Sequence, residues 1–193
     1  MRVIQYPHPT LRHVSKQLKR VDAELHRMIR EMFELMYEAK GIGLAANQVD
    51  LPYRLFVLNL ESDPQARDLE HVFINPVLTS RKGMAEAEEG CLSLPGLYAE
   101  VRRPERVTLE AYTPGGQQVT MELDDLFARA AQHEIDHLDG KLFIDRLTPT
   151  GEMAVRPTLD DFERQYYGHR DRGEIPDDAT VAKRLEELER LRT

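Results

Sequence analysis

The chain has 193 residues, of which 41% are hydrophobic and 31% charged, and its formal net charge is −8. This length suits one folded domain with a hydrophobic core, and the composition is typical of a soluble globular protein. An acidic surface repels phosphate backbones, which argues against nucleic acid as the main partner. Because no apolar run could span a membrane and the first residues lack the apolar core of a signal peptide, the sequence predicts a cytoplasmic location.

The first half of the chain predicts one amphipathic helix followed by a tightly packed loop. Residues 3–21 are expected to be irregular because two prolines interrupt them. A helix is then predicted from a cap at Asp22 to about Lys40. Its apolar face consists of residues at helical spacing: Leu25, Met28, Ile29, Met32, Phe33 and Met36. The small side chains of residues 41–48, Gly-Ile-Gly-Leu-Ala-Ala-Asn-Gln, predict a loop that permits close packing.

The middle of the chain predicts strands. Residues 54–60 and 71–78 are apolar runs of the length of buried strands. Residues 83–97 are expected to be irregular because glycine and proline recur there. Apolar residues alternate at 107–111, and a Pro-Gly-Gly turn predicts a hairpin that returns through 118–123.

A second helix, predicted from about Asp124 to Leu138, carries the strongest chemical signal. It contains His133-Glu-Ile-Asp-His137, and residues four apart on a helix point the same way. Two such histidines can bind one divalent metal, and the glutamate between them can reach a water beside that metal. Leu126 and Ala130 lie on the same helix face as the two histidines, and both are expected to lie in the core. Two solvated histidines on an exposed helix face therefore explain the pattern less well than a metal site.

A hydrolytic metal site needs a third protein ligand. The extended zinc-protease motif would place a histidine at position 143, where this chain has Phe143. Glu152 and Glu163 are alternatives, but both lie beyond the apparent catalytic body. Cys91 is preferred because a thiolate is a good metal ligand and the glycines and proline of 89–96 predict a shaped loop.

Gln48 is a further candidate for a catalytic role. It ends the loop of small residues, and a glutamine amide donates the hydrogen bonds that stabilise an oxyanion. A catalytic domain is predicted at 1–147, followed by a charged C-terminal extension at 148–193. A final amphipathic helix in that extension is predicted by Val181, Leu185 and Leu188, whose stripe could pack on the body, on a second subunit or on another partner.

Three segments in this order resemble the motifs of the peptide deformylases, a family of iron-dependent metallohydrolases, in its bacterial type. They are Gly41–Gln48, Glu89–Ser93 and Gln132–His137. The resemblance implies an α+β fold in which a partly open antiparallel sheet surrounds a central metal-binding helix. It also implies hydrolysis of the N-formyl group of formyl-methionine at the start of new polypeptides, with release of formate.

The resemblance also implies roles for particular residues. One divalent metal, natively Fe²⁺ with Zn²⁺, Ni²⁺ or Co²⁺ as substitutes, would be bound by Cys91, His133 and His137. Glu134 would be the general base and acid, and Gln48 with the backbone N–H of Leu92 would form the oxyanion hole. The methionine pocket would be lined by Ile42, Gly43, Leu92, Leu126, Ala130 and His133.

The expected partners are N-formyl-methionyl peptides, including nascent chains at the ribosome. Residues 151–193 carry 8 Lys/Arg against 11 Asp/Glu, which argues against direct docking of the extension on ribosomal RNA. Two other functions stay open at this point. A metalloendopeptidase would need a ligand after the second histidine, and a non-catalytic metal-binding module would need neither Glu134 nor Gln48.

Overall fold

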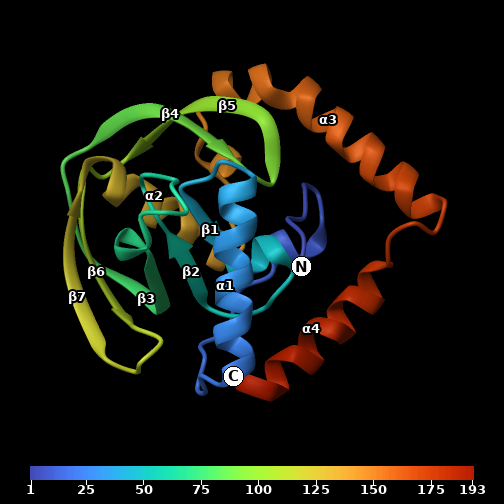
Figure 1. The fold of residues 1–193 in the computed structure, drawn as a ribbon. Coiled ribbons are helices and arrows are strands. Elements are labelled where there is room, and N and C mark those ends of the chain that lie inside the picture. The colour runs from blue at the N-terminus through green and yellow to red at the C-terminus, as the bar shows by residue number, and fades with distance from the viewer.

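A five-stranded antiparallel sheet, a separate hairpin and four α-helices form the fold, which a computed structural model describes for residues 1–193 (Figure 1). The large sheet has the order β1-β2-β3-β6-β7, and each neighbouring pair is antiparallel. Its strands are β1 (Gly43–Ala45), β2 (Leu55–Leu58), β3 (His71–Lys82), β6 (Arg106–Tyr112) and β7 (Gln118–Asp124). The sheet does not close, so the predicted α+β class with a partly open antiparallel sheet is confirmed.

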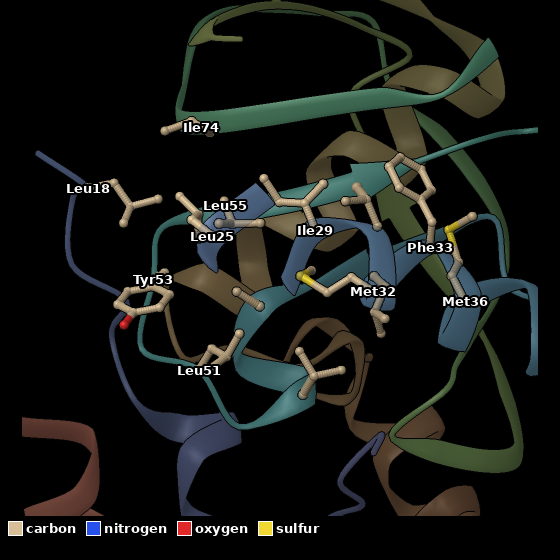
Figure 2. Close-up of a cluster of buried hydrophobic side chains, with 14 residues drawn as sticks. Leu18, Leu25, Ile29, Met32, Phe33, Met36, Leu51, Tyr53, Leu55 and Ile74 are labelled. Carbon is tan, nitrogen blue, oxygen red and sulfur yellow. The ribbon is translucent and has the colours of Figure 1, made fainter. Parts of the chain in front are cut away.

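Helix α1 (Ala23–Glu38) covers one face of the sheet. The Asp22 side chain caps it by accepting a hydrogen bond from the Leu25 backbone N–H at 2.9 Å. The apolar side packs against residues of β1, β2 and β3 in a cluster of 14 buried residues (Figure 2). Fully burying one such side chain contributes roughly 1.5–3 kcal/mol, so this stripe holds the helix firmly on the sheet.

Helix α2 (Asp125–Leu138) covers the opposite face. Successive strand residues point to opposite sides of a sheet. In β2, Val57 therefore packs in the α1 cluster, whereas Phe56 packs with Ala131 and Ile135 of α2. One side of α2 is thus packed on the sheet, and His133 and His137 lie on the side of the helix that faces Cys91.

The predicted irregular segment 83–97 is instead most of a β-hairpin, made of β4 (Ala85–Cys91) and β5 (Leu94–Arg103). Gly90 lets the two strands approach closely, since a Cβ atom at this position would lie 2.5 Å from the Tyr98 ring. The register shifts next to this glycine, as at a β-bulge. The glycine that predicted a loop therefore lies at an irregular strand end, next to Cys91.

The C-terminal region contains two helices, α3 (Pro149–Asp171) and α4 (Asp178–Arg192). Figure 1 shows α3 extending away from the hairpin and α4 returning toward the start of α1. The predicted final helix is present, and its stripe packs on the body of the same chain, with Val181 and Leu185 buried. Helix α3 was not predicted. Its internal Pro157 is tolerated because it lies on the exposed side, where water can reach the carbonyl that the proline leaves unbonded.

None of the helices combines the length and apolar composition that crossing a membrane requires.

Candidate metal centre and catalytic cleft

Three side chains that could hold a metal ion converge where α2 meets the end of β4. The Nε2 atoms of His133 and His137 lie 3.2 Å apart, and the Cys91 Sγ lies 3.2 Å from the His137 Nε2. All three donor atoms lie within 4.8 Å of one another. Zn–N and Zn–S bonds of ~2.1 and ~2.3 Å in a tetrahedral site imply donor separations of about 3.4–3.6 Å. The three residues therefore fit one ion, and they are the three that the sequence predicts as metal ligands.

The local charges favour a cation at this position. Burial by itself lowers the pKa of His133, but hydrogen bonds to Cys91 and Glu89 outweigh it and raise the pKa to about 10. Burial also lowers the pKa of His137, which keeps that ring neutral and able to donate a lone pair to a metal. The neighbours that stabilise a proton on His133 would also stabilise a metal ion beside it.

A buried carboxylate holds the first histidine from behind. Glu89 lies 3.0 Å from the His133 Nδ1, and it accepts two hydrogen bonds from Arg103 at 2.6 and 2.8 Å. Burial opposes the ionised form of Glu89, yet the bonds from Arg103 and His133 hold its pKa well below the usual range. The other side of Arg103 donates to Asp136 at 2.7 Å. This series of hydrogen bonds fixes the orientation of the His133 ring, as metal binding requires.

Glu134 is buried next to this centre. Only 4% of the residue is exposed, and its Oε2 has no hydrogen-bond partner. Burial is the main reason that the pKa of Glu134 is raised to about 7, close to what proton transfer at neutral pH requires. Space for the carboxylate comes from Gly43, where a Cβ atom would lie 2.5 Å from the Glu134 Oε1.

Gln48 approaches from the opposite side, and its amide orientation is fixed. Its Oε1 accepts a hydrogen bond from the Ala45 backbone N–H at 2.9 Å. Its Nε2 therefore points to the centre, where it lies 3.2 Å from the Ser93 Oγ and 3.4 Å from the Cys91 Sγ. Such a fixed N–H donor suits the stabilisation of negative charge.

A cleft with a volume of about 730 Å³ opens beside these groups. All of the predicted site residues except the fully buried His137 line it: Ile42, Gly43, Gln48, Cys91, Leu92, Leu126, Ala130, His133, Glu134. Ala130 is buried as expected, but the expectation that Leu126 lies in the core is wrong. Leu126 is 51% exposed, because at the start of α2 it borders the open cleft instead of packing on the sheet.

Several residues of the site were not found from the sequence. Two of them contact predicted residues: Glu89 contacts His133, and Ser93 contacts Gln48. The other two, Arg103 and Arg129, donate to the carboxylate of Glu89. A signal existed for Glu89, because metal-binding histidines commonly donate their second N–H to a carboxylate, and Glu89 lies two residues before Cys91 in the segment Glu89–Ser93. No local pattern indicates Arg103, whose role depends on how the hairpin packs on α2.

Comparison with known families gives a consistent result. The family model described as polypeptide deformylase matches residues 1–153. A peptide deformylase of Rhodopirellula baltica is 45% identical over 191 residues, covering 99% of this chain and 94% of that protein. One from Neisseria meningitidis serogroup B is 43% identical over 159 residues, covering 82% of this chain and 93% of that protein.

Solved structures give the same similarity in three dimensions. The Plasmodium falciparum peptide deformylase superposes with a TM-score of 0.84 at 38% identity, covering 86% of this chain and 98% of that one. Arabidopsis thaliana peptide deformylase 1B gives a TM-score of 0.84 at 37% identity, with 92% and 97% covered.

Proposed function

This chain belongs to the peptide deformylase family, and from that premise we propose how its residues remove the N-formyl group from new polypeptides. The overall reaction is hydrolysis of the formyl amide, which yields formate and a free N-terminal amine. The relatives reported above are all peptide deformylases, and nothing in these comparisons favours the metalloendopeptidase alternative.

Cys91, His133 and His137 hold one divalent metal in this proposal, natively Fe²⁺, with Zn²⁺, Ni²⁺ or Co²⁺ able to substitute. The convergence of a thiolate and two imidazoles supports it, because this donor set suits these ions better than Mg²⁺ or Ca²⁺. When bound, the metal polarises the formyl carbonyl and lowers the pKa of a neighbouring water toward ~7.

Glu134 transfers the proton. Its carboxylate accepts a proton from the attacking water as the oxygen bonds to the formyl carbon, and it gives a proton to the amine nitrogen as the C–N bond breaks. The support is the burial of Glu134 in the cleft wall and its raised pKa, which lets one group serve as base and then as acid.

Gln48 and the backbone N–H of Leu92 stabilise the negative charge that develops on the formyl oxygen. The fixed orientation of the Gln48 amide supports this role, because its N–H needs no rearrangement during the reaction. Removing one such donor typically costs ~2.7–4 kcal/mol in the barrier.

The substrate methionine occupies the cleft beside these groups. Its pocket is formed by Ile42, Gly43, Leu92, Leu126, Ala130 and His133, all of which line the cleft. A largely apolar wall with small residues suits an unbranched thioether side chain. The physiological substrates in this proposal are formyl-methionyl nascent chains in the cytoplasm, without direct contact between the acidic extension and nucleic acid.

The observation that carries the proposal is the meeting of three metal ligands, Glu134 and Gln48 at one cleft. The test measures formate release from a formyl-Met peptide by anaerobically purified protein of known metal content, beside cleavage of casein. Formate release that scales with metal content, without casein cleavage, is expected. Casein cleavage without formate release would favour the endopeptidase instead.

A further inference from the structure

The first residues of the chain form a strap, defined here as residues 3–12, that connects the two sides of the proposed oxyanion hole. The Ile4 backbone N–H donates to the Gln48 carbonyl at 2.8 Å. Two residues later, the Tyr6 backbone N–H donates to the Ser93 carbonyl at 2.9 Å. The strap thus bonds to the residue that carries one proposed donor and to the neighbour of Leu92, which carries the other.

Helix α3 holds this strap from the other side. The Tyr6 hydroxyl donates to the Glu163 carboxylate at 2.6 Å. Ile4 of the strap also shares a buried cluster with Val155 and Leu159 of α3. The strap is therefore enclosed between the site and a helix that carries none of the proposed catalytic groups.

A second contact fixes the turn that carries Gln48. This turn, the short 3₁₀-helix η2 (Ala46–Val49), ends at Asp50. The Asp50 carboxylate accepts a hydrogen bond from the Thr10 hydroxyl of the strap at 2.5 Å and pairs with Arg184 of α4. The turn is thus tied to the strap at Gln48 and again at Asp50. Helix α3 packs on the strap near the first tie, and α4 pairs with the residue that makes the second.

We propose that Tyr6 and Glu163 are positioning residues, whose hydrogen bond lets α3 fix, through the strap, the separation between the Gln48 and Leu92 donors. The proposal rests on the oxyanion roles given to those two residues above. Donors must be held within ~0.5 Å of the productive geometry, and a misplacement of ~1 Å can cost ~10²-fold in rate. A brace that limits smaller shifts is therefore expected to act on kcat.

The test uses the full-length, metal-loaded enzyme and a short formyl-Met peptide, assayed well below the melting temperature. Tyr6→Phe and Glu163→Leu are each expected to lower kcat by ~3- to 10-fold, with KM and metal content unchanged. Their double variant is expected to lose no more than either single one, since both remove the same bond. Glu163→Gln keeps an oxygen that accepts from Tyr6 and is expected to retain kcat.

Two controls separate positioning from general stability. Arg156→Gln removes the other ion pair of Glu163, 3.1 Å long, and leaves the strap untouched, so normal kcat is expected. In a Gln48→Leu background the donor to be positioned is absent, so adding Tyr6→Phe should lower kcat by less than ~2-fold.

A normal kcat in both Tyr6→Phe and Glu163→Leu, or an equal loss with and without Gln48, would overturn the proposal. If Gln48→Leu alone leaves kcat unchanged, the oxyanion role itself fails. If Gln48→Leu is impaired while Tyr6→Phe and Glu163→Leu are both normal, only the bracing role fails.

Discussion

Two arginines are almost completely buried, and their surroundings differ in a way that separates the site from the C-terminal helices. Arg103, 2% exposed, joins Glu89 and Asp136, which are 6% and 5% exposed. Arg192, 3% exposed, joins the end of α4 to Asp22 and Glu24 near the start of α1. Arg192 also donates to the buried hydroxyl of Tyr53, but only Arg103 has carboxylate partners that are themselves removed from water.

The difference predicts unequal consequences when the arginine is lost. The side chains of Asp22 and Glu24 are 19% and 50% exposed, so water can replace Arg192. Water cannot readily replace Arg103 between its buried partners, and a buried carboxylate without a partner is costly. Although the two arginines are buried to the same degree, Arg103 supports the candidate metal centre, whereas Arg192 attaches α4 to the start of α1.

The largest effect is expected for Arg103→Met, which keeps the volume and removes the charge. Glu89 retains Arg129 and Asp136 retains Arg146, so the loss of stability should be about 3 kcal/mol, the lower end for a broken buried pair. Metal affinity should fall ~10–100-fold, since the orientation of the His133 ring depends on Glu89. Urea unfolding and competition with a chelator would measure both, and unchanged metal affinity would contradict the coupling to the site.

Glu134→Gln should separate chemistry from this supporting structure. The amide keeps the shape and removes the base, so kcat should fall by at least ~10² while metal content and stability persist. The sign of the pH dependence follows from the pKa of about 7: the base form is lost as pH falls through that value, so activity should decline on the acid side. A bound cation lowers the pKa of Glu134, so the decline in activity moves to lower pH. Glu134→Gln should abolish this pH-dependent decline. Loss of metal in this variant would indicate a ligand instead of a base.

Arg192→Met is the matched counterpart of Arg103→Met in the C-terminal region. It removes hydrogen bonds to Tyr53, Asp22 and Glu24, whose two carboxylates can regain water. The expected loss is about 1.5 kcal/mol of unfolding free energy, the lower end of what a hydrogen bond to a charged group contributes, because water replaces the arginine at the carboxylates. Metal content and kcat/KM should stay at the level of the unmodified chain, as metal analysis and peptide turnover would show. A loss of metal equal to that of Arg103→Met would remove the distinction between the two regions.

The same comparison explains how much the sequence predicts. The helix positions of His133 and His137 follow from local spacing, because residues four apart share a face in any helix. Four strands of the large sheet follow from local apolar runs or alternation, whereas β1 lies within residues 41–48, for which a loop is predicted. The pairing of Arg103 with Glu89 depends on the hairpin, and its pairing with Asp136 depends on how the hairpin packs against α2; no local period encodes either. The hairpin itself was missed because Gly90 reads as a loop residue but serves close packing with Tyr98.

The C-terminal region shows a second limit. The stripe of α4 is regular enough to predict a helix, yet its site of burial on the same chain is a tertiary outcome. Helix α3 is long and mostly exposed, so its sequence lacks a broad apolar face, and Pro157 argues against a helix unless its exposed position is known. The strap was expected to be irregular, and its function as a connector is visible only from the contacts that it makes.

The smallest effect is expected at Glu189 of α4, which pairs with Lys16 and His13 near the N-terminus. Burial alone would raise the pKa of Glu189, but the bonds from Lys16 and His13 outweigh it and lower the pKa. A depressed folded-state pKa contributes stability that is present above the unfolded value of ~4.3 and is lost as pH falls through the folded value. Because Lys16 is 61% exposed, screening limits the contribution to ~0.5–1 kcal/mol. Glu189→Gln should therefore be less stable by that amount at pH 7, and the difference from the unmodified chain should shrink in urea titrations at acidic pH. A difference that stays constant down to the lowest pH at which the chain remains folded would show that the contact acts through packing and not through charge.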